Sequence, residues 1–402
     1  MKYTPPALSR TLPLPRGGLG RGNFVSHQNE KGYITQIISN MTKKVLILGG
    51  RGRIGYSVAL DIAKYTQAEI TITGRTSREN YQDVALQYLT LDLAETEKLR
   101  EIIPEYNLVV HCAGPFHLRD TQVLELCIDN GVNYIDISDH RSYTIKALKL
   151  NEKALNAGII AVVNTGIFPG ISNSMVRQCI EKLDIAEKIH LSYVVAGSGG
   201  AGITVMRTTF LGLQHPFDAW INGAWQQVKP YTARENINFP APYGQSGVYW
   251  YDMPEAFTLP QAFPTVKTVI TKFGSIPDFY NHLTWIAAHL FPKFWIQSSY
   301  GIEFLSQVSH LMTDVTDRLT GVGVAVRVEV SGIKDEQTSV ATSNLFHENT
   351  AVAAGCGTGS IAQLILEDKL TQPGVLTVEE ALSNHLFEQV MAQREIVIMP
   401  TN

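Results

Sequence analysis

The most constraining feature of the sequence is a glycine-rich turn between a short apolar run and a helical pattern. Residues 45–48 are all apolar, which is typical of a strand buried on both faces. Gly50, Gly52 and Gly55 follow with the spacing G-x-G-x-x-G, and apolar residues then recur at helical spacing over 56–63. A strand, a glycine triplet and a helix in this order predict the first unit of a dinucleotide-binding domain.

Each position of this motif has a physical task. Gly50 permits the tight turn, Gly52 lets the backbone approach a pyrophosphate, and Gly55 lets the helix pack closely on the strand. Arg53 and Ile54 open the helix, whose first N–H groups and positive end attract phosphates. We therefore expect all five residues to bind the cofactor. The alternative is a tight turn without a ligand.

The second strand indicates which dinucleotide is bound. Residues 69–73 alternate like a strand, and an NAD site usually places an acidic residue on the ribose directly after it. This chain instead has GRTSR at 74–78, with no carboxylate to repel a 2′-phosphate and with arginines that can bind one. We expect Gly74, Arg75 and Thr76 to contact NADP(H), with NAD as the second choice. Alternatively, these arginines are solvated loop residues.

Composition limits the class of protein. The chain has 402 residues, which suits two domains, and its 45% hydrophobic and 17% charged residues are typical of a soluble globular protein. The formal net charge of −4 gives no sign of a nucleic-acid partner.

The cysteines and the longest apolar stretch point to a cytoplasmic protein. The four cysteines contain no CxxC pair and no metal-binding spacing, so we expect reduced thiols and no metal. No stretch approaches the ~20 apolar residues of a transmembrane helix. The nearest, 283–296, is interrupted by Pro292 and suits a buried or dimer-interface helix. A weak contact with a membrane surface is the alternative for it.

The first forty residues lack hydrophobic periodicity and are rich in Pro, Gly and Arg. We expect residues 1–40 to be disordered, and Met41 stands where a Rossmann domain normally begins. A basic targeting peptide is the competing interpretation.

Strand and helix patterns alternate after the second strand. This alternation predicts a Rossmann-type, doubly wound parallel sheet, and we place the dinucleotide-binding domain at 41–172. Strands are expected at 88–93, 108–113, 133–139 and 159–164, with helices at 118–130 and 142–157.

The pattern changes after residue 172. A glycine-rich loop at 197–202 is followed by aromatic, irregular sequence and then by a strictly alternating strand at 324–330. We expect a second α/β domain at 173–345 that binds the substrate. Residues 346–402, with a helix at 349–367 and a strand at 396–399, are expected to return to the Rossmann domain.

Several motifs together resemble the saccharopine dehydrogenase-like family of NAD(P)-dependent oxidoreductases. The resemblance implies a Rossmann domain, a mixed-sheet domain for substrate binding and dimerisation, and frequently a homodimer. It also implies reductases that join an amino acid to a carbonyl compound. Members often carry Glu where this chain has Asp139. The motifs are LILGGRGRIG, VVHCAGPF, YIDISD, TGIFPGISN, GSGGAG and PGVLTVEEAL.

Cofactor and substrate are expected beyond the carboxyl ends of the strands, where open α/β sheets bind ligands. Asp92 ends the third strand, where it meets the adenine or caps the next helix. Ala113, Gly114 and Pro115 end the fourth strand along the ribose and nicotinamide, and Phe116 faces the substrate.

Four further residues are candidates for chemistry and substrate binding. Asp139 and His140 follow the fifth strand and are the best-placed titratable pair for moving a proton. Their alternative roles are a turn cap and a surface histidine. Asn173 follows the sixth strand, and Arg207 could hold a substrate carboxylate or form an ordinary salt bridge.

Two functions fit these patterns. The first is an NADP(H)-dependent oxidoreductase that transfers a hydride to or from a C=N or C=O bond of a small, amino-acid-derived substrate. The second is a dinucleotide-binding protein without turnover, acting as a redox sensor or a partner-binding module. A defined proton donor favours the first.

Overall fold

A computed structural model describes residues 42–76, 86–199 and 203–401. The expectation of disorder at 1–40, Arg78 and the end of the 197–202 loop lie outside the described residues. Residues 43–402 form one compact unit that holds two seven-stranded sheets. Among the described residues, no helix is long and apolar enough to cross a membrane.

The first sheet is entirely parallel, in the order β15-β6-β5-β4-β1-β2-β3. Its central strands are apolar because both faces are covered. Val45 and Ile47 of β1 join one core, and Leu46 and Leu48 join the other. The strands are β1 (Lys44–Leu48), β2 (Glu69–Gly74), β3 (Leu86–Thr90), β4 (Leu108–His111), β5 (Asn133–Asp136), β6 (Ile160–Val163) and β15 (Gly374–Thr377).

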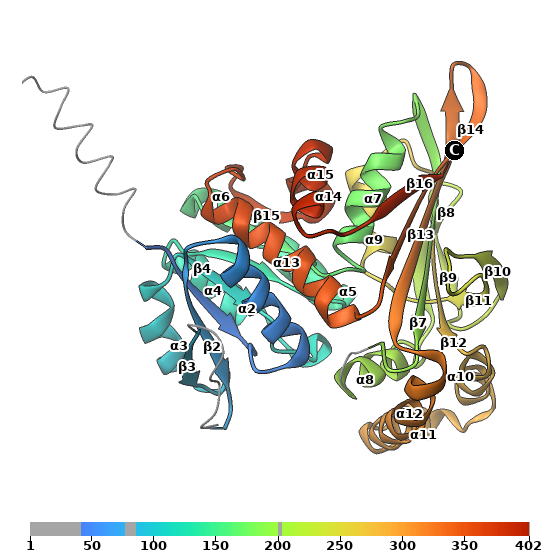
Figure 1. Cartoon of the computed structure of the whole chain (residues 1–402), viewed down its shortest axis with the longest axis horizontal. Helices are drawn as coiled ribbons and strands as arrows, with labels where there is room; N and C mark the ends of the chain where they lie inside the picture. The colour runs from blue at the N-terminus through green and yellow to red at the C-terminus, as the bar shows by residue number, and fades with distance from the viewer. Residues whose placement is uncertain (1–41, 77–85, 200–202, 402) are drawn as a thin grey trace, which may run out of the picture. The chain divides into compact units, whose positions relative to one another are not determined.

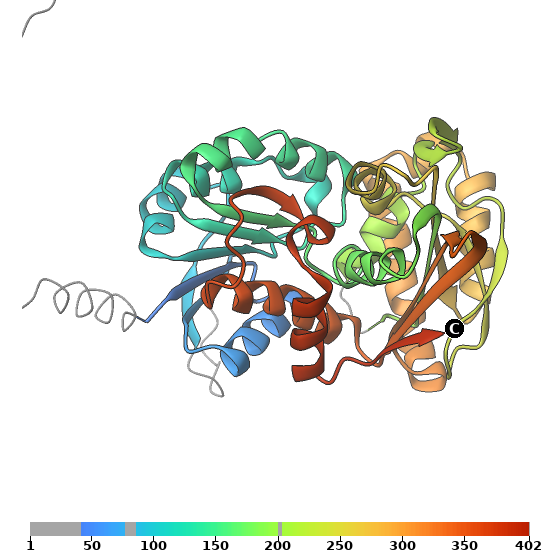
Figure 2. The same cartoon turned by 90° about the horizontal axis from the view of Figure 1, so that it is seen from above.

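Helices cover both faces of this sheet, as Figure 2 shows from above. α2 (Arg53–Tyr65) and α13 (Thr350–Leu366) cover one face. The other face carries α3 (Thr96–Ile102), α4 (Gln122–Asp129), α5 (Arg141–Leu148) and α6 (Asn151–Ala157), with the 3-10 turns η1 (Ile103–Glu105) and η2 (Phe116–Leu118). The predicted doubly wound fold is therefore confirmed.

The second sheet is mixed, in the order β10-β11-β12-β7-β13-β14-β16, and only β12 and β7 pair in parallel. Figure 1 shows it beside the first sheet, so the two-domain α/β architecture is confirmed. Its strands are β7 (Ile185–Ala196), β10 (Glu235–Asn238), β11 (Gln245–Trp250), β12 (Thr268–Ile276), β13 (Gly323–Lys334), β14 (Gln337–His347) and β16 (Ile398–Thr401).

Eight further helices and one small hairpin complete the described residues, and two of these helices, α14 and α15, follow β15 of the first sheet. The hairpin is β8 (Phe217–Ile221) and β9 (Ala224–Val228). The helices are α7 (Ile171–Ile180), α8 (Ile203–Leu211), α9 (Glu255–Ala262), α10 (Phe279–Leu290), α11 (Lys293–Ile296), α12 (Ser299–Thr320), α14 (Val378–Ala381) and α15 (Asn384–Gln393).

Several elements differ from the prediction in extent or partner. The helix expected at 142–157 is two helices, α5 and α6, and the stretch 283–296 is broken before α11. The C-terminal segment divides between the sheets, since β15 pairs with β6 and β16 pairs with β14. The proposed boundaries at 172 and 345 remain a prediction.

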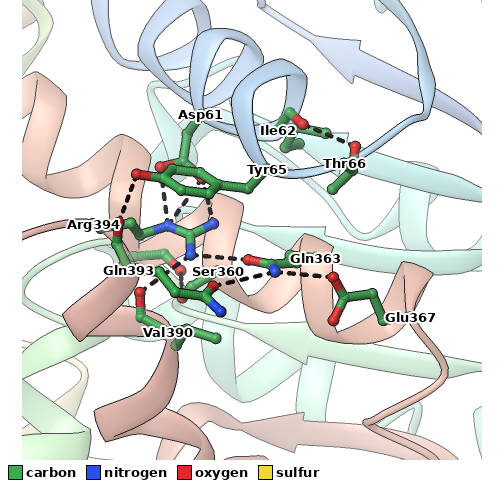
Figure 3. A network of polar contacts seen from close by, with 11 residues as sticks. Asp61, Ile62, Tyr65, Thr66, Ser360, Gln363, Glu367, Val390, Gln393 and Arg394 are labelled. Atoms are coloured by element: carbon green, nitrogen blue, oxygen red, sulfur yellow. Dashed lines mark hydrogen bonds and ion pairs between the residues drawn. The ribbon is translucent and has the colours of Figure 1, made fainter.

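A buried ion pair fixes helix α2 against the C-terminal helices (Figure 3). Arg394 Nη2 lies 2.7 Å from Asp61 Oδ1, and the two side chains are 0% and 6% exposed. Arg394 also donates to Gln363 of α13, and its guanidinium lies over the Tyr65 ring at 4.2 Å. Gly355 lets α13 approach α2, because a Cβ there would meet Ser57 at 2.8 Å.

Candidate active site

A cavity of about 700 Å³ lies at the carboxyl end of the first sheet, where strands β1, β2, β4 and β5 end. Its lining comes from the turn after β1, the ends of β2 and β4, the loop after β5, and α8 of the second domain. The sequence predicts a ligand at this edge, and most of the predicted residues lie on the cavity wall.

The start of α2 forms one end of the cavity. Gly52, Arg53, Ile54 and Gly55 line it, so the first turn of the helix faces the position expected for a pyrophosphate. A Cβ on Gly55 would collide with the Gly49 carbonyl. Because glycine has no Cβ, the first turn of the helix can lie this close to the preceding turn of the chain. Gly50 is not on the wall.

Gly50 instead shapes the turn. A Cβ at this position would meet the Ile72 Cβ at 2.6 Å, so a larger residue would push the turn away from β2. Its predicted role in the turn fits this geometry, whereas direct contact with the cofactor remains a prediction.

The end of β2 forms a basic corner of the cavity. Gly74, Arg75 and Thr76 line it, together with Arg51 from the glycine-rich turn. The Arg51 Nη1 donates to the Thr76 carbonyl, to Thr76 Oγ1 at 2.8 Å and to the Tyr88 hydroxyl at 3.1 Å. A second cation therefore lies beside Arg75.

Sequence reasoning missed Arg51, although it stands inside the motif. The usual motif places the residue that contacts the ribose at the end of β2, about 20 residues after the glycines. Arg51 reaches the end of β2 in space, although it precedes β2 in the sequence. A Cβ on Gly74 would collide with Arg51 Cδ, so the glycine leaves the path along which the arginine crosses the strand end.

Asp92 lies on the cavity wall but does not cap the next helix, and its contact with the adenine remains a prediction. It lines the cavity with Leu91 and Leu93, which makes it available to the adenosine side of a cofactor. Its Oδ1 also accepts a hydrogen bond from the Ala94 N–H at 3.0 Å, although Glu95 is the residue that precedes α3.

The loop after β4 forms the other end of the cavity. Ala113, Gly114, Pro115 and Phe116 all line it. Arg119 lies on the same wall and donates from Nε to the Ala113 carbonyl at 2.9 Å. Sequence reasoning missed this arginine, because it lies in a loop without a motif.

Asp139 is a half-buried acid on the cavity wall. Burial raises the pKa of its carboxyl to about 6. Hydrogen bonds from its own backbone and from the Thr208 side chain lower the pKa, but by less than burial raises it. Thr208 and Val205 line the cavity from α8, so residues of both domains enclose this end. The carboxyl is therefore able to hold or release a proton near neutral pH.

His140 is not on the described wall of the cavity. Its Nδ1 lies 2.9 Å from Ser142 Oγ, and its ring packs 5.9 Å from the His117 ring. Burial lowers its pKa to about 4, with positive neighbours adding to the effect, so the ring is neutral at physiological pH. A catalytic role for it remains a prediction without a cavity contact.

Of the three residues predicted to bind substrate, Phe116 lines the cavity, whereas Asn173 and Arg207 lie off its described wall. The Asn173 amide donates to Glu379 at 2.8 Å, and its oxygen accepts from the Gly170 N–H that starts α7. Arg207 forms two hydrogen bonds to Glu303, at 2.6 and 2.8 Å. The salt-bridge alternative for Arg207 therefore describes its contacts.

The domain that carries the basic corner and the glycine-rich turn matches a known family. A family profile for the saccharopine dehydrogenase NADP-binding domain matches residues 45–162. Residues 45–162 form a domain of this family. The predicted resemblance is confirmed, and NADP is the cofactor class of the domain.

Curated relatives match over short stretches. A probable mitochondrial saccharopine dehydrogenase-like oxidoreductase of Arabidopsis thaliana is 27% identical over 112 residues, 23% of this chain and 25% of that protein. A human saccharopine dehydrogenase-like oxidoreductase is 32% identical over 76 residues, 19% of this chain and 18% of that protein. Because one relative is named mitochondrial, a cytoplasmic location remains a prediction.

A solved structure resembles the whole two-sheet architecture. The saccharopine dehydrogenase (L-Glu forming) of Saccharomyces cerevisiae aligns with a TM-score of 0.60 and 13% identity, over 90% of this chain and 100% of that one. At this identity the likeness concerns the fold, and substrate and reaction require their own argument.

Proposed function

We propose that this chain is an NADP(H)-dependent oxidoreductase that transfers a hydride to or from a C=N or C=O bond of a small substrate. The observation that carries the proposal is the position of Asp139, a half-buried residue on the wall of the cofactor cavity whose carboxyl has its pKa raised to about 6. A protein that only senses the dinucleotide has no need of such a group.

The cofactor fits the cavity from the glycine turn to the loop after β4. Arg51 and Arg75 are proposed to hold the 2′-phosphate, and the first turn of α2 is proposed to hold the pyrophosphate. When bound, the nicotinamide supplies or accepts the hydride.

The chain's own residues then have three tasks at the far end. Phe116 and Val205 exclude water from the substrate, because they are apolar and line the wall. Asp139 holds the proton that a carbonyl oxygen receives on reduction, and Thr208 orients the carboxyl by its hydrogen bond. In the oxidative direction the carboxylate takes that proton back.

An amino-acid-derived substrate would need a cation for its carboxylate. Of the residues that line this end of the cavity, Arg119 is the candidate, since Arg207 is paired with Glu303. We therefore move the predicted carboxylate contact from Arg207 to Arg119. The homodimer implied by the resemblance is a further proposal.

The experiment is a turnover assay on the full chain. NADPH is mixed with amino acids paired with keto acids or aldehydes, and with each carbonyl compound alone, while its absorbance is followed. Oxidation that depends on one substrate class supports the proposal. If NADPH binds tightly but no member of the panel is reduced, and no alcohol or amine is oxidised with NADP, the sensor alternative replaces it.

A further inference from the structure

The end of the cavity beyond the loop after β4 combines an apolar wall with two ionisable side chains. Its residues come from η2, the loop after β5 and α8, and therefore from both domains. They are Phe116, Leu118, Arg119, Ile137, Asp139 and Val205, which we call the substrate end.

The apolar part of the substrate end is already held in place by the protein. The Phe116 ring is buried and packs against the rings of His111 and Tyr143, with both pairs of ring centroids 5.0 Å apart. Leu118 is 73% exposed although it lies on the cavity wall. Because burial of apolar surface is favourable, a ligand that covers Leu118 with an apolar group gains affinity.

Arg119 is the one cation of the substrate end, and its charge is not neutralised by a described acid. Its Nε donates to the Ala113 carbonyl at 2.9 Å and its Nη2 to the Gly114 carbonyl at 3.5 Å, and both acceptors are uncharged. By contrast, Arg207 of α8 and Arg141 of α5 each form an ion pair with a carboxylate. The guanidinium of Arg119 is therefore free to bind an anion.

The charges of the substrate end match one carboxylate and disfavour a second. The other ionisable residue is Asp139, which is itself an acid, so a second carboxylate would face either this acid or the apolar wall. Burial of an unpaired charge is costly. Residues 200–202, which precede α8 and are not described, are Gly, Ala and Gly and add no charge.

The position of Asp139 favours a carbonyl group over a C=N bond as the reacting group. Reduction of a ketone requires a proton for its oxygen, whereas a protonated imine requires only the hydride. Thr208 hydrogen-bonds the Asp139 carboxyl on the cavity wall, so a proton donor is held where the oxygen needs one.

We propose that the substrate is an α-keto acid with one carboxylate and an apolar side chain. The inference rests on the proposed function. Arg119 binds the carboxylate, and the four apolar residues of the substrate end contact the side chain. The carbonyl carbon gains the hydride of NADPH, and the electron pair of the C=O π bond forms an O–H bond with the proton of Asp139. The products are NADP and an α-hydroxy acid, and the Asp139 carboxylate takes a proton from water.

Three ketones that differ in one group test the proposal with the full chain and NADPH, in a buffer without amines. Phenylpyruvate carries one carboxylate and an apolar side chain. Oxaloacetate has a second carboxylate in place of the phenyl ring, and phenylacetone has a methyl group in place of the carboxylate. We expect kcat/KM to be about 10–100-fold higher for phenylpyruvate than for either of the others, which is the size of one charge-assisted contact.

Two substitutions separate the contributions of the carboxylate and the side chain. Arg119→Met should remove most of the preference for phenylpyruvate over phenylacetone. The matched control is Lys153→Met, which removes an exposed cation on α6 and keeps this preference. Leu118→Arg should raise kcat/KM for oxaloacetate about 10-fold or more, because the second carboxylate then has a cation.

Binding to the NADP complex gives a measurement that does not depend on turnover. By calorimetry, phenylpropionate should bind about 10-fold or more tightly than succinate, which has a carboxylate in place of the phenyl ring. Arg119→Met should weaken phenylpropionate binding by about 10-fold or more. Thermal unfolding establishes that each variant is folded.

The outcomes distinguish failure of the substrate class from failure of the proposed function. Oxaloacetate or phenylacetone reduced as efficiently as phenylpyruvate would overturn the substrate class and leave the oxidoreductase in place. Failure to reduce any of the three ketones would also overturn it, whether or not phenylpropionate binds. In that case, activity with another member of the wider turnover panel preserves the proposed function, and inactivity with all of them removes it.

Discussion

At the residue scale, the basic corner of the cavity gives the first prediction. Arg51→Ala and Arg75→Ala should each weaken NADPH binding by about 1.5–3 kcal/mol and leave NADH binding nearly unchanged, since only NADPH carries the 2′-phosphate. Titration of each variant with both cofactors measures this. Arg100→Ala, at an exposed position on α3, is the matched control. Equal losses for NADH and NADPH would remove these arginines from the phosphate site.

Asp139 gives the second residue-scale prediction, once a substrate is found. Asp139→Asn should lower kcat/KM by about 10²–10⁴-fold, because the amide cannot exchange the proton. The pKa of the carboxyl is raised to about 6 by burial, so the protonated donor is lost as pH rises through 6. Reduction should therefore slow above that pH, and oxidation should slow below it. A greater loss in His140→Gln than in Asp139→Asn would reverse the assignment.

Much of the cofactor cavity can be predicted from the sequence, because backbone requirements select its residues. A glycine motif between an apolar strand and a helix fixes both the tight turn and the start of the helix. The sequence therefore places residues 52–55 and 74–76 at one ligand-binding edge of the sheet. In the structure, these residues line the cavity. Arg51 and Arg119 escape prediction, because their place on the cavity wall follows from contacts with other elements. Arg207 was predicted to bind the substrate, but it pairs with Glu303. This pairing could not be predicted, because Glu303 lies 96 positions further along the sequence.

At the element scale, the ion pair of Figure 3 ties α2 to α13 and α15. Arg394→Leu should lower the free energy of unfolding by about 3–5 kcal/mol, because it leaves the Asp61 carboxylate buried without its cation. The double variant Asp61→Leu with Arg394→Leu should recover much of that loss, as no charge then remains buried. Denaturant unfolding measures both. A double variant no more stable than the single one would contradict this electrostatic origin of the loss.

The same scale shows where the periodicity of the sequence misleads. The helix pattern over 142–157 is continuous, yet the helix is interrupted between Leu148 and Asn151, where α5 ends and α6 begins. The strand expected at 396–399 lies within a few residues of β16. Its partner β14 could not be predicted, because strand pairing depends on the whole fold.

At the scale of the whole molecule, residues 43–402 form one compact unit that carries every described contact with the cavity. A chain that starts at Met41 should therefore fold and bind NADPH as the full chain does. Thermal unfolding and cofactor titration test this. A chain that ends at residue 373 is the contrasting variant, because it lacks β15 and Arg394 and should fail to fold. Loss of NADPH affinity in the first variant would show that the N-terminal residues contribute.

The position of β15 has a consequence for synthesis on the ribosome. Strand β6 ends at Val163, but its outer neighbour β15 begins at Gly374, and α13 is synthesised only after strands β7 to β14. Throughout the translation of about two hundred residues, the first sheet has an open edge, and one of its apolar faces is covered by α2 without α13. Such edges pair readily with other chains, so the nascent protein depends on protection that the finished protein no longer needs.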